Sequence, residues 1–224
     1  MKSLLLTLAF TIVGSFGHAQ MTEGYIKFNV KVSSEEPGMA MAVAMMQDAN
    51  MIVYFNESAV RSEVDMGISQ QIAMFDVTTD SMLMLMDMLG KKLAIPMSVK
   101  EITESTGETP KYSISVKKKE QKEIAGHKCT KAIVSDEEGN EVEVWYTEKI
   151  KPPFNKATSA DGWQAELPGY ALEYSTVQNN IEMHYIATEV SDEVDTSLLK
   201  LAIPDGYEKV SLEELEEKIG GANH

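Results

Sequence analysis

Apolar and polar residues alternate along most of the chain between residues 22 and 207. In the segment 24–32, GYIKFNVKV, the side chains of Ile26, Phe28 and Val30 fall on one side of an extended chain and the lysines on the other. This period of two is typical of strands with one face toward a core. It recurs in residues 50–67 (two strands joined at 56–58), 71–77, 111–118, 126–135, 140–148, 170–176 and 181–190. Turn signals at 136–140 and 177–180 separate the last pairs, so the pattern predicts an antiparallel, mostly meandering sheet.

Residues 80–97, DSMLMLMDMLGKKLAIPM, contain methionine at every even position from 82 to 88 and leucine or Asp87 at the odd ones. Successive residues on a helix are about 100° apart, which would mix the two sets, whereas a strand keeps them on separate faces. The segment therefore predicts a strand, a turn at 89–92 and a second strand. A short buried helix is the alternative reading of such a run. A membrane span is excluded by its length and by Asp87.

Two segments depart from this alternation. Pro37, the acidic residues before it and an alanine-rich composition predict a helix over 38–48, although its methionines and alanines also alternate as in a strand. At 211–221, Ser211 and Glu214 form a capping-box pattern that predicts a surface helix ending at the glycine pair. Residues 152–168, which include Phe154 and Trp163, form the longest irregular stretch.

Methionine is concentrated in one part of the chain, since twelve of its fifteen methionines lie between Met39 and Met97. The methionine side chain is unbranched and polarizable and adapts to irregular apolar guests. The concentration therefore indicates an adaptable apolar lumen, with an ordinary core as the alternative. The candidate lining residues are Ile26, Phe28, Val30, Met41, Met45, Met82, Met84 and Met86.

The first nineteen residues resemble a secretory signal peptide, with Lys2 before an apolar run and small residues around Ala19. Cleavage after Ala19 would leave residues 20–224 as one domain, in the periplasm or secreted. The net charge of −15 disfavours nucleic acid and anionic lipid surfaces as partners. Cys129 is the only cysteine, so the chain has no internal disulfide.

Catalytic and metal-binding patterns are weak. His127 and His184 lack the spacing of metal ligands, and the acidic segments at 135–141 and 211–217 do not match a calcium-binding loop. Cys129 lies two residues from His127 on the same strand face, which is awkward for a nucleophile and its base. We therefore expect no metal, no cofactor and no enzyme activity.

Residues 122–150 resemble an Ile-Ala-Gly-x-Lys-Cys-x-Lys-Ala hairpin followed by Val-Trp-Tyr-Thr, which is found in a secreted Bacteroidetes domain family of unknown function. The matching residues are Ile124, Ala125, Gly126, Lys128, Cys129, Lys131, Ala132, Val144, Trp145, Tyr146 and Thr147. Residues 166–174 are similar to the Leu-Pro-Gly signature of the related GLPGLI proteins, with Tyr170 and Ala171 in place of Leu-Ile.

This resemblance implies a mainly β fold like that of the LolA/LolB lipoprotein carriers. Such a fold is a curved antiparallel sheet, or incomplete barrel, with one or two helices covering its concave face and here a short C-terminal helix. That superfamily holds apolar guests, chiefly acyl chains. Its carriers usually present an arginine under a lid, which makes Arg61 a candidate ligand-site residue. The alternative is a solvent-facing arginine paired with Glu63.

The leading hypothesis is a periplasmic, non-catalytic carrier or sensor that binds a lipid or an acylated protein, with peripheral membrane contact at most. Residues 38–48 are the candidate lid. The alternative is an envelope protein-interaction or structural module whose cavity is filled by its own side chains. The acidic surface and the loop carrying Phe154 and Trp163 could then seat an envelope protein partner.

Overall fold

One twelve-stranded sheet dominates the computed structural model, which describes residues 20–67, 69–88, 90–106, 111–153, 162–178 and 180–215. The strands are β1 (Gly24–Ser33), β2 (Asn50–Phe55), β3 (Ala59–Asp65), β4 (Ser69–Asp76), β5 (Ser81–Met88), β6 (Lys91–Ser98), β7 (Ser113–Ile124), β8 (His127–Ser135), β9 (Glu141–Thr147), β10 (Tyr170–Gln178), β11 (Ile181–Ser191) and β12 (Glu208–Lys209). Their order is β12-β6-β5-β4-β3-β2-β1-β11-β10-β9-β8-β7. The predicted mainly β class and the period-two strands are confirmed.

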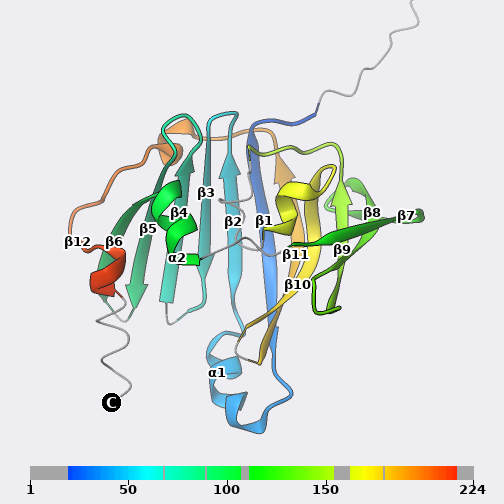
Figure 1. Ribbon diagram of the computed structural model, residues 1–224, viewed down its shortest axis with the longest axis horizontal. Helices are drawn as coiled ribbons and strands as arrows, with labels where there is room; N and C mark the ends of the chain where they lie inside the picture. Colours follow the sequence, from blue (N-terminus) through cyan, green and yellow to red (C-terminus); the bar gives the residue numbers. More distant parts are fainter. Residues whose placement is uncertain are drawn as a thin grey trace, which may run out of the picture.

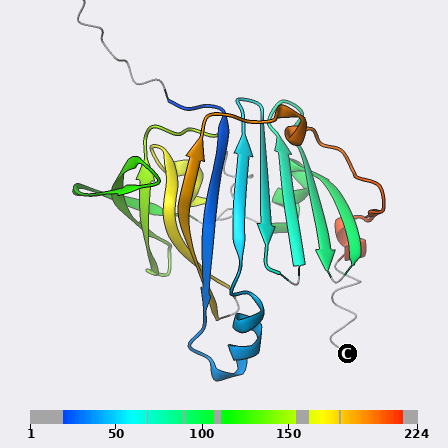
Figure 2. The same cartoon turned by 180° about the vertical axis from the view of Figure 1, so that it is seen from behind.

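Two meanders make up the sheet. Strands β1 to β6 pair in chain order, strands β7 to β11 do the same, and the antiparallel pairing of β1 with β11 joins them. The short strand β12 pairs in parallel with β6 at one edge, while β7 forms the other edge, so the sheet is curved but not closed (Figures 1 and 2). The run of alternating methionines is strand β5, as expected, and it forms a hairpin with β6.

The two faces of the sheet are covered by different segments. On the concave face lie the helix α2 (Val99–Thr106) and the 3-10 turn η2 (Trp163–Glu166), both in front of the strands in Figure 1. The convex face carries the 3-10 turn η3 (Thr196–Leu199) and the segment after it, which are seen in Figure 2. The concave face therefore has the helical cover that the predicted fold requires.

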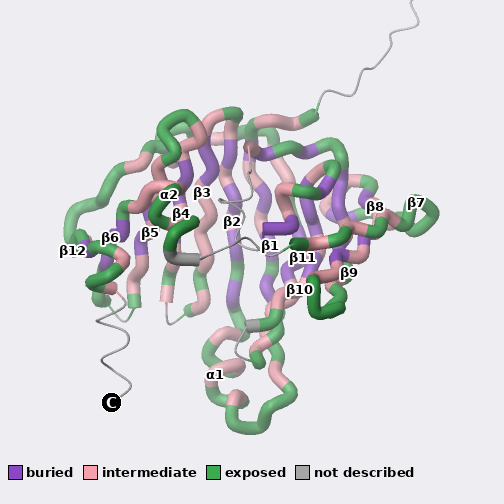
Figure 3. Tube along the Cα trace, in the orientation of Figure 1, coloured by how far each residue is buried: buried purple, intermediate pink, exposed green. Residues whose placement is uncertain are grey.

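The largest core lies on the concave face where β1, β10 and β11 meet (Figure 3). Phe28 packs edge-on against Tyr170 and Tyr174, with ring centroids 6.4 Å apart in both pairs. Tyr174 in turn stacks on Tyr185 at 4.7 Å and meets Trp163 of η2 at 5.5 Å. These aromatic contacts close the concave face on the β1 side.

Smaller clusters stabilise the other half of the sheet. On the convex face, Leu201 and Tyr207 pack on a buried group formed by Ile72, Met74, Leu83, Leu85 and Ala94. On the concave face, Val210 covers Leu93 and Ile95 of β6. The odd-numbered leucines of β5 therefore face the convex side and its even-numbered methionines the concave side.

The segment predicted as a helix over 38–48 forms the 3-10 turn η1 (Pro37–Met39) and the helix α1 (Ala40–Met45). The helical prediction is confirmed with a shorter length. The position expected for a lid is wrong, because the segment projects beyond the ends of β1 and β2 and does not lie over the concave face (Figures 1 and 2). None of the residues of η1 and α1 is buried.

Capping boxes start the helix α2 and the helix that begins after Ser211. The backbone N–H of Ser211 donates to Glu214 (2.8 Å) and the N–H of Glu214 donates to the Ser211 hydroxyl (3.1 Å), as predicted. Ser98 and Glu101 make the same reciprocal pair, at 2.7 and 3.2 Å, at the start of α2. The sequence reading did not predict α2, although the Ser-x-x-Glu pattern that signals it is present. The signal-peptide segment 1–19 and Phe154 lie outside the described residues.

Candidate functional site

The strand register places six of the nine predicted site residues on the concave face. One row of paired residues across the sheet runs Ile26, Val53, Ser62, Ala73, Met84, Ile95. A second row runs Phe28, Met51, Val64, Gln71, Met86, Leu93, and Met82 belongs to a third with Phe75 and Met97. Val30 follows Phe28 by two positions and shares its face. Residues that are more than fifty positions apart in the chain thus line one surface.

Ile26, Phe28 and Val30 belong to the packed half of that surface. Their exposed fractions are 0%, 2% and 2%, and the aromatic cluster of η2, β10 and β11 covers them. Burial also raises the pKa of the Tyr170 hydroxyl. This half of the face is a side-chain-filled core, as the alternative hypothesis expected for the whole concavity.

Met82, Met84 and Met86 behave differently, because all three remain half-buried. Met97 of β6 pairs with Met82 and is half-buried as well. We call these four residues the methionine strip. Between the strip and the packed half, the concave face carries the small side chains of Ser62 and Ala73, both also half-buried. The strip is thus a part of the concave face on which apolar side chains stay partly accessible.

Met97 was not among the site residues predicted from the sequence, although its position in the β5–β6 hairpin places it beside them. Met88 pairs with Lys91, and each step of one residue away from this pair along β5 is matched by one step along β6, so Met97 must oppose Met82. Side chains paired directly across antiparallel strands share one face. The register of the hairpin therefore shows that Met97 belongs to the same face as Met82.

The other three predicted site residues lie elsewhere. Met41 and Met45 project on α1 with 74% and 50% of their surface exposed. Arg61 lies on the convex face, where its Nε donates to Glu63 at 2.5 Å and its Nη1 donates to the backbone oxygen of Leu198 in η3 at 3.3 Å. The structure does not bring these three residues together with the methionine strip. The pairing of Arg61 with Glu63 agrees with the alternative interpretation, but the arginine is largely buried under η3.

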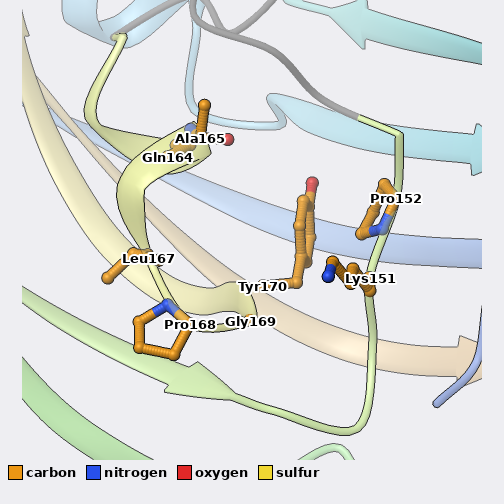
Figure 4. A pocket seen from close by; sticks show the side chains of 8 residues that line it. All are labelled: Lys151, Pro152, Gln164, Ala165, Leu167, Pro168, Gly169 and Tyr170. Carbon is orange, nitrogen blue, oxygen red and sulfur yellow. The ribbon is translucent and has the colours of Figure 1, made fainter.

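A small pocket opens beside η2 at the edge of the packed half (Figure 4). It encloses about 340 Å³, including the part open to solvent, and is lined by Lys151, Pro152, Gln164, Ala165, Leu167, Pro168, Gly169 and Tyr170. The Tyr170 ring stands between Pro152 and η2 with its hydroxyl pointing into this space. None of these residues was a sequence candidate, although five of the eight lie in the irregular stretch 152–168.

Cys129 and His127 do not form a nucleophile and base. The Cys129 thiol is fully buried, and burial raises its pKa to about 11. Its Sγ donates to the backbone oxygen of His127 at 3.5 Å, so the contact is with the main chain. Burial also lowers the pKa of His127. Burial therefore holds the Cys129 thiol in its protonated form, which is the poorer nucleophile.

The hairpin used for the family resemblance builds a polar cluster around Trp145 on the convex face. Lys131 pairs with Trp145 in the register of β8 and β9, and its Nζ contacts Glu143 at 2.6 Å and Glu120 at 3.2 Å. These hydrogen bonds, that to Glu143 first, raise the pKa of Lys131. The Nζ of Lys122 lies 4.3 Å from the Trp145 ring centroid and 2.7 Å from the carboxylate of Glu173. The signature residues therefore stabilise the sheet surface through cation–π and ionic contacts.

Within the described ranges, no group of three or more His, Cys, Asp or Glu side chains is placed to hold a metal ion. None of the helices in the described part of the chain has the length and apolar character needed to cross a bilayer.

Comparison with known proteins gives one family match. The model of a domain of unknown function, DUF4412, matches residues 36–161, which include the 122–150 hairpin. The expected relation to a family of unknown function is therefore confirmed. Among curated proteins no relative is found.

Several solved structures resemble the chain, including the following two. The first is described as a β-barrel-like protein of domain of unknown function DUF1849 from Brucella abortus, with a TM-score of 0.39 and 7% identity over 77% of this chain and 98% of that one. The second is MucB, with a TM-score of 0.34 and 8% identity over 83% of this chain and 59% of that one. At this level of similarity neither structure identifies a ligand or an activity.

Proposed function

The chain belongs to the DUF4412 family, a domain of unknown function, and we propose that it binds an apolar ligand, with the chemistry of an acyl chain, on the methionine strip of the concave face. The observation that carries this proposal is the half-buried state of Met82, Met84, Met86 and Met97 beside a fully packed core. The ligand could be a free lipid or the acyl chain of a modified protein. A carrier or sensor role follows from such binding.

Methionine suits this task for two physical reasons. Its side chain has three rotatable bonds and a polarizable sulfur, so it adapts its shape to a chain that lies in several registers. Each methylene group of a ligand that leaves water contributes about 0.8 kcal/mol. Ser62 and Ala73, which lie beside the strip, have small side chains and are half-buried, and we expect such a chain to lie over them. The rest of the concave face, being packed, would serve as a rigid support.

We further propose that this role is non-catalytic and follows export. The buried, poorly acidic thiol of Cys129 supports the first point, and the signal-peptide pattern of residues 1–19 supports the second. The acidic surface would keep an exported carrier soluble and away from anionic lipid headgroups.

The test is binding of a fluorescent fatty acid, followed by displacement with an unlabelled fatty acid and with an acylated peptide. We expect the protein, after extraction of bound lipid, to bind the probe with a stoichiometry of one. The replacement Met84→Trp should weaken binding at least about tenfold, since the indole would occupy the accessible space over the strip. Displacement by only one competitor would identify the source of the acyl chain.

Two variants serve as controls. Met84→Leu keeps an apolar side chain of similar size and should bind nearly as the original protein does. Met88→Trp adds the same bulk to the end of β5, where the side chain is 52% exposed, and should leave binding unchanged. Absence of probe binding by the extracted protein, or equal binding by Met84→Trp, would reject the proposal.

The second candidate function is an envelope protein-interaction module, and the packed β1 half of the concave face favours it. In that case the methionine strip would contact a protein partner rather than an acyl chain. The fatty-acid probe would then fail to bind, while cross-linking from a photoreactive residue at position 84 would capture one protein from the cell envelope. That pair of results separates the two functions.

A further inference from the structure

Two exposed methionines on α1 are left without a role by the packing of the fold. Met41 and Met45 are 74% and 50% exposed, and no residue of η1 or α1 is buried. An exposed helix of this size gains nothing from two large apolar side chains, because they remain in water when the protein folds. A core function for these two residues is therefore excluded.

The spacing of the two methionines places both residues on the same side of the helix. Residues i and i+4 are neighbours on a helix surface, with about 5–6 Å between their Cβ atoms. Each thioether sits at the end of a three-bond side chain that can turn toward the other. The pair can therefore close on a single small ion.

A third methionine lies at the turn that faces the end of α1. Met66 and Gly67 form the β3–β4 turn, and a β-carbon at Gly67 would stand only 3.3 Å from the backbone oxygen of Met45. The turn is held by the N–H of Gly67 donating to Asp65 at 2.8 Å and the N–H of Met66 donating to the Ser69 oxygen at 2.9 Å. It is thus a fixed element next to the helix.

The helix end is anchored to the sheet as well. The N–H of Ala49 donates to the oxygen of Met46 and the N–H of Val30 donates to the oxygen of Ala49, both at 3.1 Å. Ala49 itself is buried, with 2% of its surface exposed. These contacts tie the end of α1 to β1, and the pairing of Asn50 with Asp65 ties the next residue to the end of β3 beside the turn, as a preorganised site requires.

Thioether sulfur is a soft ligand that selects Cu(I) over hard divalent cations. Asp48 and Asp65 are exposed and lie three residues after Met45 and one residue before Met66 in the chain, and the whole chain is acidic, so the charge favours the approach of a cation. We propose that Met41, Met45 and Met66 bind a soft monovalent cation, Cu(I) or its redox-inert analogue Ag(I). This site is separate from the methionine strip and does not depend on acyl-chain binding.

The test uses the full chain and two probes. Ag(I) is titrated in chloride-free buffer and followed by native mass spectrometry, and Cu(I) affinity is measured by competition with a colorimetric Cu(I) chelator. We expect one equivalent of either ion to bind. Labelled methionine methyl groups should show shifts on Ag(I) addition for three of the fifteen residues, assigned by the variants below.

Leucine replacements separate the role of sulfur from that of an apolar side chain. Met41→Leu with Met45→Leu keeps size and apolarity, so folding should be unaffected, but affinity should fall at least about tenfold, since even the loss of a group behind a metal ligand typically costs 10- to 100-fold. Met66→Leu should also weaken binding. The control with Met82, Met84 and Met86 all replaced by leucine should keep the affinity.

Several outcomes would overturn the site. These are no stoichiometric binding of either ion, unchanged affinity in the Met41→Leu, Met45→Leu double variant, or loss of affinity in the methionine-strip control. If the exposed methionines instead contact a lipid or a protein, the leucine variants would keep that contact, and the metal titrations would be flat. Failure of acyl-chain binding leaves these results unaffected.

Discussion

Gly169 packs against the backbone oxygen of Thr147 so closely that a β-carbon at position 169 would stand 2.1 Å from that oxygen. The contact lies where β10 begins beside the end of β9, and Tyr170 pairs with Thr147 in the register. Thr147 is itself buried, with 1% of its surface exposed. The glycine of the Leu-Pro-Gly segment is therefore required by close backbone approach.

Replacing Gly169 by alanine should destabilise the fold. The added methyl group meets main-chain atoms, which cannot move aside as a flexible side chain would, so we expect a loss of about 2–4 kcal/mol in the free energy of unfolding. Urea unfolding measures it. Gly38→Ala is the matched control, since a β-carbon there meets nothing within 4 Å, and should change stability by less than about 0.5 kcal/mol. Equal stability of the two variants would contradict this reading of the Gly169 contact.

Cys129 should react slowly with thiol reagents in the folded protein. Burial raises its pKa from 9.0 to about 11, which lowers the thiolate fraction near pH 8 roughly 100-fold, and the lack of access slows the reaction further. Alkylation by iodoacetamide, followed by mass spectrometry, should be rapid only in denaturant. His127→Ala should not change the rate in the folded state, because the thiol contacts the main chain of residue 127. Fast labelling of the native protein that depends on His127 would indicate a catalytic pair.

Most strands were predictable because one of their faces is more buried than the other, and the resulting period of two is visible in the sequence. The exposed strand β12 has no such signal. The period of two held even for β5, where leucine and methionine are both apolar: the buried Leu83 and Leu85 and the half-buried Met82 and Met84 occupy opposite faces. Within each strand, alternation shows which residues share a face, and the strand register then connects the faces of different strands. Ile26 and Met84 share a row because the register of four intervening hairpins connects them.

The placement of covering segments was not predictable in this way. Alternation shows which residues share a face, but it does not say which segment covers that face. Arg61 was expected near the ligand, yet its odd-numbered position on β3 directs it to the convex face, where η3 lies. Residues 38–48 were expected over the sheet and instead project beyond it, and no residue of η1 or α1 is buried. How full the concavity is depends on Trp163 and Tyr170, which reach it from a loop and a distant strand.

Asp76 should make the stability of the fold depend on pH in the acid range. Its carboxylate accepts from the Thr78 hydroxyl at 2.6 Å and from the N–H groups of Thr78 and Thr79 at 2.8 and 3.2 Å. The hydroxyl bond is the leading reason that its pKa falls below 3.8 in the folded state. A depressed folded pKa stabilises the protein above the unfolded value, and this stabilisation is lost as the pH falls through the folded value.

The measurement is urea unfolding of the original protein and Asp76→Asn at a series of pH values. The difference in unfolding free energy should be constant above about pH 5 and shrink below the unfolded pKa of 3.8. Thr78→Val removes the hydroxyl donor but keeps Asp76, so it should reduce the same pH-dependent part. A difference that persists unchanged to the lowest pH would show that charge is not its origin.

Arg61 should hold the segment after β11 on the convex face. Its Nη1 donates to Leu198 at 3.3 Å while its Nε pairs with Glu63 at 2.5 Å, and only 16% of its side chain is exposed. Arg61→Ala leaves a largely buried carboxylate and a carbonyl unpaired, which costs about 1–3 kcal/mol. We expect the amide hydrogens of residues 196–207 to exchange faster in Arg61→Ala than in the original protein, while the amide hydrogens of the sheet change little.

Lys27→Ala, which removes an exposed ion pair with Glu189 on the same face, should leave that segment protected, because exposed pairs contribute little. Unchanged exchange at 196–207 in Arg61→Ala would mean that Leu201 and Tyr207 alone hold the segment through their apolar contacts.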